Sequence, residues 1–302
     1  MENLCELCPR KCNIDRSKTT GFCNSGDKIK ISKVMLHYFE EPIISGEDSD
    51  QSKTGGSGAI FFANCNLKCC YCQNYEISSD GDGKEVSIST LANIFKQLEQ
   101  TGAYNINLVT PTHYTNQIIE ALKLYRPNIP IIWNTSGYES VESIKNIKDY
   151  VDIYLTDLKY FSSEISLKYS KAHDYFAQAS ESIIQMRKNQ PNDIIENGLM
   201  KKGLIVRHLV LPNQTEDSQH IIDWINENLG NKTFVSLMSQ YVPMANAKAF
   251  VELNRKIKPI EYKILVNKLK KLGFINTFTQ ELSSAQTCFT PDFSETKSNF
   301  DY

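Results

Sequence analysis

The densest group of side chains able to do chemistry is a run of four cysteines, Cys65, Cys69, Cys70 and Cys72. Read through Cys69, the run has the spacing C-x3-C-x2-C, which puts three thiolates on one short loop. Three thiolates can hold three irons of a [4Fe-4S] cluster, whereas an electron-transfer cluster of this kind normally takes four. The fourth iron would stay open. An open iron can chelate the amino and carboxylate groups of S-adenosylmethionine (SAM) and bring its sulfonium close enough for one-electron reduction, which yields a carbon radical.

Two other interpretations of this run are buried structural thiols and a zinc site. Four cysteines within eight residues, directly after an apolar strand, are not typical of core packing, and this favours the cluster. Cys70 competes with Cys69 for the middle ligand position, because adjacent side chains on a loop rarely face the same cluster. The spacing favours Cys69.

A second group of cysteines lies at the start of the chain, with the spacing C-x2-C-x3-C-x10-C. Its members are Cys5, Cys8, Cys12 and Cys23. Four thiolates suffice for a structural zinc site or for a second [4Fe-4S] cluster, and the sequence does not choose between them. Free thiols are a third interpretation, but four close cysteines in a segment poor in core residues favour a metal. A cluster there would be able to relay electrons inward, while Cys288 stands alone near the end of the chain.

Six short apolar runs predict the β-strands that must position these groups. They are residues 59–63, 106–110, 129–133, 151–156, 204–211 and 234–238. Between them, apolar residues recur at helical spacing, as at Leu91, Ile94, Phe95 and Leu98. Alternating strands and helices indicate parallel βαβ units in an α/β protein. Six such units can form a partial (β/α)6 TIM-like barrel with its chemistry at the carboxyl ends of the strands; an open doubly wound sheet is the alternative.

Composition and charge bound the remaining possibilities. We divide the chain into a cysteine-rich N-terminal segment (1–46), a polar loop (47–57), the barrel (58–280) and a C-terminal tail (281–302). The net charge is -2, and no apolar run approaches the ~20 residues of a membrane helix. The first residues lack the pattern of a secretory signal. We therefore expect a cytoplasmic protein, with neither a membrane nor a nucleic acid as its partner.

With these motifs the chain resembles the radical SAM superfamily, whose C-x3-C-x-aromatic-C motif is matched by Cys65, Cys69, Tyr71 and Cys72. Further segments are similar to the PflX-like subgroup, which resembles pyruvate formate-lyase activating enzymes. These segments are residues 57–62, 72–74, 108–114, 207–212, 239–241 and 291–293. The resemblance extends over nearly the whole chain, and it implies a radical SAM barrel with one [4Fe-4S] cluster and SAM as cofactors.

The resemblance also implies that SAM lies across the strand ends, where polar residues are candidates for binding it. Tyr71 would lie beside the adenine, and Tyr241 would contact the ribose in place of a histidine. Thr110 and Thr112 stand where many relatives have a Gly-Gly-Glu turn for the amino group of the cofactor. The other candidate cofactor-binding residues are Asn134, Thr135, Asp157, Lys159 and Arg207.

Charged residues among these candidates have specific implied roles. Asp157 would bind a monovalent cation, although Asn134 replaces an aspartate of the relatives and removes one negative charge. Lys159 would offer its charge to a carboxylate, and Arg207 would serve the cofactor carboxylate. The alternative is a solvated salt bridge between Asp157 and Lys159, and a buried ion pair at Arg207.

The resulting hypothesis is an oxidoreductase that cleaves SAM reductively to a 5′-deoxyadenosyl radical for hydrogen abstraction. The resemblance makes a glycyl residue of a partner enzyme, a glycyl radical enzyme, the leading substrate, with flavodoxin or ferredoxin as electron donor. One alternative is radical modification of an RNA, a peptide or a small metabolite. Another is a protein without enzymatic activity, a metal-bearing nucleic-acid-binding or electron-transfer module.

Overall fold

The structure is a computed structural model that describes residues 4–46, 55–282, 293 and 300. Within these residues, ten strands form a sheet in the order β10-β9-β8-β6-β5-β4-β2-β1-β3, with β7 paired to β8. In chain order the strands are β1 (Ile29–His37), β2 (Ser57–Phe62), β3 (Lys84–Val86), β4 (Asn105–Val109), β5 (Ile131–Thr135), β6 (Ile153–Asp157), β7 (Ile194–Glu196), β8 (Leu199–Leu209), β9 (Phe234–Met238) and β10 (Thr277–Thr279).

Six strands of this sheet run parallel and side by side: β2, β4, β5, β6, β8 and β9. They correspond to the six strands predicted from the sequence. Because each pair is parallel, the chain must return through a crossover after every strand. The predicted partial (β/α)6 barrel is confirmed; β10 extends it at one edge, and the antiparallel β1 and β3 extend it at the other.

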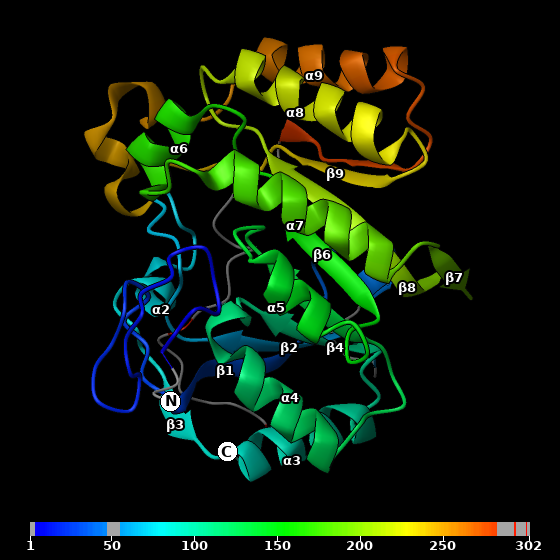
Figure 1. Ribbon diagram of the computed structural model, residues 1–302. Helices are drawn as coiled ribbons and strands as arrows, with labels where there is room; N and C mark the ends of the chain where they lie inside the picture. Colours follow the sequence, from blue (N-terminus) through cyan, green and yellow to red (C-terminus); the bar gives the residue numbers. More distant parts are fainter. Residues whose placement is uncertain (1–3, 47–54, 283–292, 294–299, 301–302) are drawn as a thin grey trace.

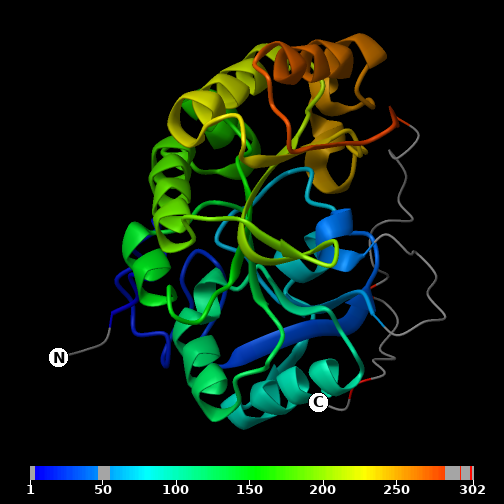
Figure 2. The same cartoon turned by 90° about the vertical axis from the view of Figure 1, so that its right-hand side faces the viewer.

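Helices cover the outer side of the curved sheet (Figure 1). The helices are α1 (Pro42–Ser45), α2 (Tyr75–Ser78), α3 (Ile88–Gln100), α4 (Thr115–Leu124), α5 (Val141–Asn146), α6 (Ser163–Ser170), α7 (Tyr175–Asn189), α8 (Thr215–Leu229) and α9 (Pro259–Lys271), with 3-10 helices η1 (Thr112–Tyr114), η2 (Ala245–Ala249) and η3 (Val251–Leu253). Helix α1 is an exception to this arrangement, because its Ile44 packs against Ile132 and Ile205 on the inner face of the sheet. In Figure 2 the helices from α3 onward form an arc around the strands. The carboxyl ends of the strands are therefore left to loops.

Helix α3 shows why the local sequence folds this way. Ser87 caps its N-terminus by accepting a hydrogen bond from the backbone N–H of Thr90. Its apolar residues recur at intervals of three and four and are all buried against the sheet: Leu91, Ala92, Ile94, Phe95 and Leu98. Burying this apolar face stabilises the fold by about 25 cal/mol for each Å² of apolar area removed from water.

Strand β1 was not among the predicted strands. Its sequence mixes lysines with apolar residues and is buried only at some positions. It therefore lacks the continuous apolar run by which the other strands are predicted. In the structure it pairs antiparallel with β2, with Val34 opposite Ile60. Residues 29–37 of the predicted N-terminal segment thus belong to the sheet, and the predicted domain division itself stays a prediction. Residues 47–54 of the predicted loop, and most of the predicted tail with Cys288, lie outside the described residues. No helix of the described part is both long and apolar enough to cross a membrane.

Candidate active site at the carboxyl ends of the strands

The loop after β2 brings the central cysteines to the carboxyl ends of the strands. Asn64 turns the chain in the left-handed region, with φ of 74°, directly after the strand. Each of the three predicted ligands then receives a hydrogen bond. Leu67 N–H donates to Cys65 Sγ over 3.4 Å, Ser170 Oγ to Cys69 Sγ over 3.0 Å, and Ser78 Oγ to Cys72 Sγ over 3.2 Å. Such donors stabilise thiolates, which are the metal-binding form of cysteine.

Without a metal, burial keeps the thiols of Cys65 and Cys69 protonated. Burial, with the neighbouring thiols, raises the pKa of Cys65 to about 12. Burial likewise raises the pKa of Cys69 to about 11, although Lys159 opposes this. A bound metal would reverse this preference and release protons. The three cysteines therefore fit the cluster that their spacing predicts.

Cys70 has different surroundings from its neighbours. Burial raises its pKa to about 12; its charged neighbours other than Cys69 are Lys171 and Glu252. Its backbone N–H donates to the carbonyl oxygen of Tyr169 over 2.8 Å. Unlike Cys69 and Cys72, it does not line the cavity beside the loop. This placement supports Cys69 as the middle ligand.

A cavity of about 230 Å³ lies beside Cys69 and Cys72. Of the predicted cofactor-binding residues, those that line it are Tyr71, Asn134, Asp157, Lys159 and Arg207. The other lining residues were not predicted: His37, Phe39, Glu40, Phe61, Gln73, Asn74, Val109, Leu209, Met238 and Gln240. The cavity thus combines an ionic wall with aromatic and carboxamide side chains.

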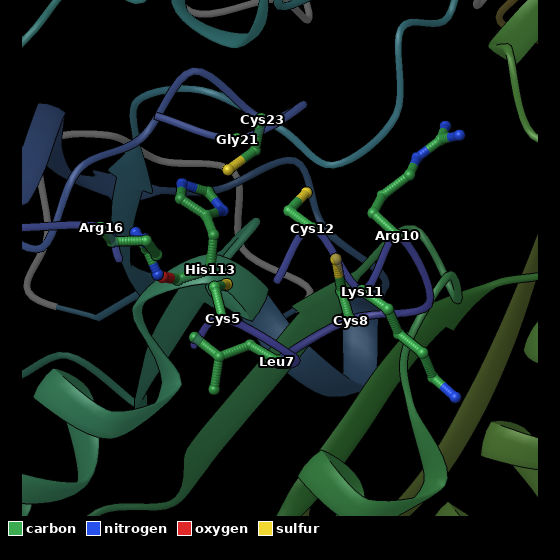
Figure 3. A pocket seen from close by; sticks show the side chains of 10 residues that line it. All are labelled: Cys5, Leu7, Cys8, Arg10, Lys11, Cys12, Arg16, Gly21, Cys23 and His113. Carbon is green, nitrogen blue, oxygen red and sulfur yellow. The ribbon is translucent and has the colours of Figure 1, made fainter. Parts of the chain in front are cut away.

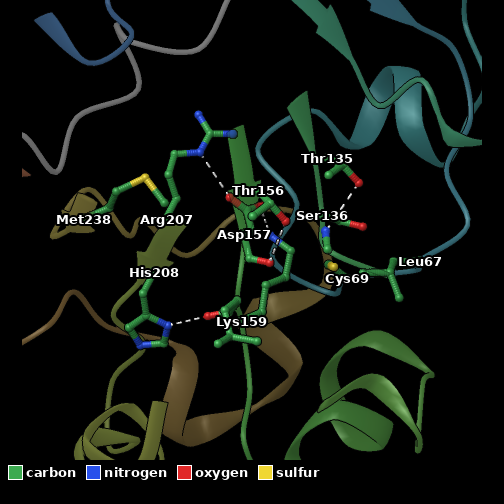
Figure 4. A network of polar contacts seen from close by, with 12 residues as sticks. Leu67, Cys69, Thr135, Ser136, Thr156, Asp157, Lys159, Arg207, His208 and Met238 are labelled. Carbon is green, nitrogen blue, oxygen red and sulfur yellow. Dashed lines mark hydrogen bonds and ion pairs between the residues drawn. The ribbon is translucent and has the colours of Figure 1, made fainter. Parts of the chain in front are cut away.

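Arg207 is the centre of the ionic wall (Figure 4). Its Nε lies 3.2 Å from Asp157 Oδ1, and Lys159 Nζ lies 2.5 Å from Asp157 Oδ2. Two further acceptors complete the guanidinium contacts. Arg207 Nη1 lies 3.0 Å from Glu40 Oε2, and Nη2 donates to Asn134 Oδ1 over 2.5 Å. Both carboxylate oxygens of Asp157 are therefore engaged by cations of the chain itself.

The electrostatics of this wall keep all three central groups charged. Burial opposes the charge of Asp157, but Lys159 and Arg207 together hold its pKa below the ordinary value. Burial also opposes the charge of Lys159, and Asp157 with the nearby thiols raises its pKa. A buried ionic wall of this kind can exchange partners with a ligand that carries both an amino and a carboxylate group.

Two acidic residues near Arg207 were not predicted from the sequence: Glu40, which lines the cavity, and Glu41 beside it. They follow β1, a strand that the apolar runs of the sequence do not predict, so no strand end was expected there. Glu40 Oε1 also accepts from Asn107 Nδ2 over 2.9 Å. Glu41 is buried, and burial raises the pKa of its carboxyl group despite the nearby Arg207. The adjacent acidic pair was the available signal in the sequence.

Two predicted threonines are engaged away from the cavity. Thr112 Oγ1 and Thr135 Oγ1 each donate to Glu139 Oε1 over 2.6 Å, and Trp133 Nε1 donates to it over 3.1 Å. Glu139 is fully buried, and burial raises its pKa although these hydrogen bonds oppose the rise. The two threonines thus stabilise a buried carboxyl group, and their predicted contact with SAM stays a prediction.

Thr110 and Tyr241 also lie outside the cavity lining. Thr110 adopts the left-handed conformation, with φ of 59°, and its N–H donates to Asn134 O over 2.9 Å. Tyr241 packs edge-on against Tyr71, with ring centroids 5.9 Å apart, and its hydroxyl donates to Leu253 O over 2.8 Å. Tyr241 therefore packs against the ring of Tyr71 and does not line the cavity.

A chain of hydroxyl groups joins the side chain of Tyr71 to Cys69 on the same loop. The hydroxyl groups of Tyr71 and Tyr160 lie 2.5 Å apart, and Tyr160 Oη lies 2.6 Å from Ser170 Oγ. Ser170 in turn donates to Cys69 Sγ over 3.0 Å. The ring of Tyr71 is thus held in place where it lines the cavity.

Comparisons with known proteins concern the chain as a whole. A family model described as the radical SAM superfamily matches residues 59–225, from β2 into α8. An uncharacterised protein of Methanocaldococcus jannaschii is 32% identical over 266 residues, which cover 84% of this chain and 70% of that protein. The pyruvate formate-lyase-activating enzyme of Clostridium pasteurianum is 23% identical over 214 residues, covering 67% of this chain and 82% of that enzyme.

Among solved structures, Streptococcus suis SuiB bound to its precursor peptide SuiA has a similar fold, with a TM-score of 0.50 and 14% identity. The match covers 73% of this chain and 48% of SuiB. The chain therefore spans about half the length of SuiB, and at this identity the likeness concerns the fold alone.

Proposed function

Because the chain belongs to the radical SAM superfamily, we propose that Cys65, Cys69 and Cys72 hold the family's [4Fe-4S] cluster for radical chemistry on a protein substrate. Membership in the family implies both this cluster and SAM. When bound and reduced, the cluster supplies one electron to the sulfonium of SAM and so provides the 5′-deoxyadenosyl radical for hydrogen abstraction. The observation that carries the proposal is that each of these three thiols has a hydrogen-bond donor and that two of them, Cys69 and Cys72, border a cavity with an ionic wall.

The chain's own residues would bind and orient SAM. Lys159 and Arg207 offer positive charge to the methionine carboxylate, and Glu40, which also lines the cavity, offers negative charge to its amino group. Asn134 keeps the guanidinium of Arg207 in place. Tyr71 provides a buried aromatic surface for the adenine. Both carboxylate oxygens of Asp157 already have cationic partners, Lys159 and Arg207, so the proposed site contains no monovalent cation at Asp157.

The rest of the cavity suits a neutral polypeptide segment. Its other lining groups include the carboxamides of Gln73, Asn74 and Gln240 and the rings of Phe39 and Phe61. Carboxamides can pair with peptide N–H and C=O groups, and aromatic rings exclude water. These properties, with the similarity to a pyruvate formate-lyase-activating enzyme, favour a glycyl residue of a partner enzyme as substrate. Flavodoxin or ferredoxin would be the electron donor.

Isotope transfer tests the substrate. Reconstituted protein, SAM and dithionite are incubated anaerobically with the protein fraction of host cells grown on glycine deuterated at its α-carbon. We expect deuterium in the 5′-deoxyadenosine and a glycyl radical signal by electron paramagnetic resonance. The Cys70→Ser variant should behave like the wild type, and Cys69→Ser should form no 5′-deoxyadenosine.

The outcomes separate the chemistry from the substrate. Unlabelled 5′-deoxyadenosine would contradict the glycyl substrate and leave the radical chemistry standing. Deuterium transfer that depends on RNA, or on the small-molecule fraction, would favour the alternative substrates. Absence of 5′-deoxyadenosine from protein with a verified full cluster would contradict the proposed reaction as a whole.

A further inference from the structure

The four N-terminal cysteines and one histidine of the barrel line a single pocket (Figure 3). The cysteines are Cys5, Cys8, Cys12 and Cys23, and the histidine is His113 of η1, directly after β4. His113 is 90 or more residues away from these cysteines in the sequence. Only the folded structure brings His113 close to the four cysteines.

The N-terminal segment is fastened to the barrel at this place. Arg10 Nε donates to Asn66 O over 3.0 Å, and its Nη1 donates to Lys171 O over 2.6 Å. Arg16 donates to the carbonyl oxygen of His113 itself. Ser143 Oγ, at the start of α5, donates to Leu7 O over 2.5 Å. The pocket is therefore formed jointly by the N-terminal segment and the barrel.

The ring of His113 has one nitrogen with a partner and one without. Nε2 lies 2.7 Å from the carbonyl oxygen of Ala63. Because a carbonyl oxygen only accepts, Nε2 must carry the proton, and Nδ1 is left with a free lone pair. His113 is 3% exposed, and its Nδ1 has no hydrogen-bond partner in the described part of the chain. A metal-binding histidine has this arrangement, with its other ring N–H donated to a backbone carbonyl.

The cysteines are also turned toward the pocket by the backbone around them. Lys11 and Asn13, on either side of Cys12, adopt left-handed conformations, as does Asn24 after Cys23. Asparagine adopts this conformation readily, whereas for Lys11 it is uncommon and indicates a constrained turn before Cys12. The N–H of Phe22 points to Cys12 Sγ over 3.5 Å, as expected for a thiolate ligand.

The pocket has five donors, and a zinc ion and a [4Fe-4S] cluster each take four ligands but arrange them differently. A structural zinc takes four ligands at 2.0–2.3 Å, so the ligands of one ion crowd around a single point. In the described residues, no three His, Cys, Asp or Glu side chains are arranged to hold one metal ion. This statement includes Cys65, Cys69 and Cys72, whose family binds a cluster. In a cluster each ligand binds its own iron, and the ligands can lie further apart.

We propose that this pocket holds a second [4Fe-4S] cluster, with Nδ1 of His113 as the ligand of one iron and three of the four N-terminal thiolates as the ligands of the others. Mixed thiolate and imidazole ligation is known for iron-sulfur centres. The new site lies close to the first cysteine set, because Asn66, next to Cys65, also hydrogen bonds Cys8. The proposal concerns metal binding alone and does not depend on the substrate proposed above.

The test starts from the full chain carrying Cys65→Ser, Cys69→Ser and Cys72→Ser, reconstituted anaerobically. We expect this variant to stay brown and to contain iron and acid-labile sulfide in equal amounts. Adding His113→Ala should change the electron paramagnetic resonance spectrum and lower cluster retention at least about tenfold in a chelator challenge, as for the loss of a metal-site residue. Added imidazole should restore the spectrum of a His113→Gly variant.

His208→Ala is the matched control, since His208 is also buried but has partners on both nitrogens, Leu158 O and Ser218 Oγ. It should leave the spectrum unchanged. About one zinc per chain and no iron would overturn the cluster, and an unchanged spectrum in His113→Ala would overturn the role of His113. If the triple variant does not fold, iron is counted in wild type and in a variant with Cys5, Cys8, Cys12 and Cys23 all replaced by serine. Equal iron in these two proteins would overturn the proposal.

Discussion

Asp157 and Arg207 are register partners at the carboxyl ends of the neighbouring parallel strands β6 and β8. Their side chains meet there, with Asp157 Oδ1 3.2 Å from Arg207 Nε. Since both strands end at the same edge of the sheet, the register alone makes the ion pair possible. The pair fixes the position of the guanidinium, which also reaches Glu40 and Asn134.

Replacing Arg207 by lysine should weaken SAM binding by about tenfold, equivalent to about 1.4 kcal/mol. A lysine keeps the charge, but it lacks the planar fork that contacts Asp157, Glu40 and Asn134 at once. Equilibrium dialysis of reconstituted protein with labelled SAM measures the effect. Lys202→Arg, an exposed change on the same strand, is the control. Equal affinity in wild type and Arg207→Lys would remove Arg207 from the binding site.

Cys69→Ser and Cys70→Ser should differ sharply in the iron content of the central cluster, although the two residues are adjacent. Cys69 accepts from Ser170 and borders the cavity, whereas Cys70 does not line it. We expect Cys69→Ser to lose most of the iron of the central cluster and Cys70→Ser to keep it. Iron analysis and electron paramagnetic resonance with and without SAM decide between them. The reverse result would make Cys70 the middle ligand.

Gly21→Ala should disturb the N-terminal site and spare the central one. A Cβ at Gly21 would lie 2.8 Å from Cys12 Sγ, so Cys12 would have to turn away. Gly26→Ala is the matched control, because its Cβ would meet only Arg16 O, at 3.4 Å. We expect less metal in Gly21→Ala that also carries the three central serines, and unchanged metal in Gly26→Ala with the same background. Equal metal in the two proteins would contradict a ligand role for Cys12.

The free energy of unfolding should fall as the pH drops from about 6.5 toward 4, in part because of His208. Burial lowers the pKa of His208 from 6.5 to about 4, so the unfolded chain binds a proton more readily in this range. Stability is therefore full above pH 6.5 and is lost below it, by up to about 3 kcal/mol at 1.36 kcal/mol per pKa unit.

Denaturant unfolding of wild type and His208→Gln at several pH values measures this contribution. The variant has no titrating group at this position, so its stability should depend less on pH between 4 and 6.5. Parallel pH profiles for the two proteins would show that His208 does not contribute.

Local spacing in the sequence was enough for the parts of this protein that depend on neighbouring residues. The apolar runs predicted the six parallel strands, because a buried strand must be apolar over its own length. The family motif of Cys65, Cys69, Tyr71 and Cys72 lies on one loop, so its geometry is also local. The family that this motif indicated is the one that the family model matches.

The tertiary structure decided which distant side chains share a site. Glu40 reaches Arg207 only because β1 pairs with β2, and the mixed sequence of β1 hid that strand. Thr112 and Thr135 stand at strand ends as predicted, yet both donate to the buried Glu139, since a buried carboxyl group needs hydrogen-bond donors. His113 meets the N-terminal cysteines through packing alone. Contacts of this kind depend on which way each side chain turns in the folded core, and a linear spacing does not encode that direction.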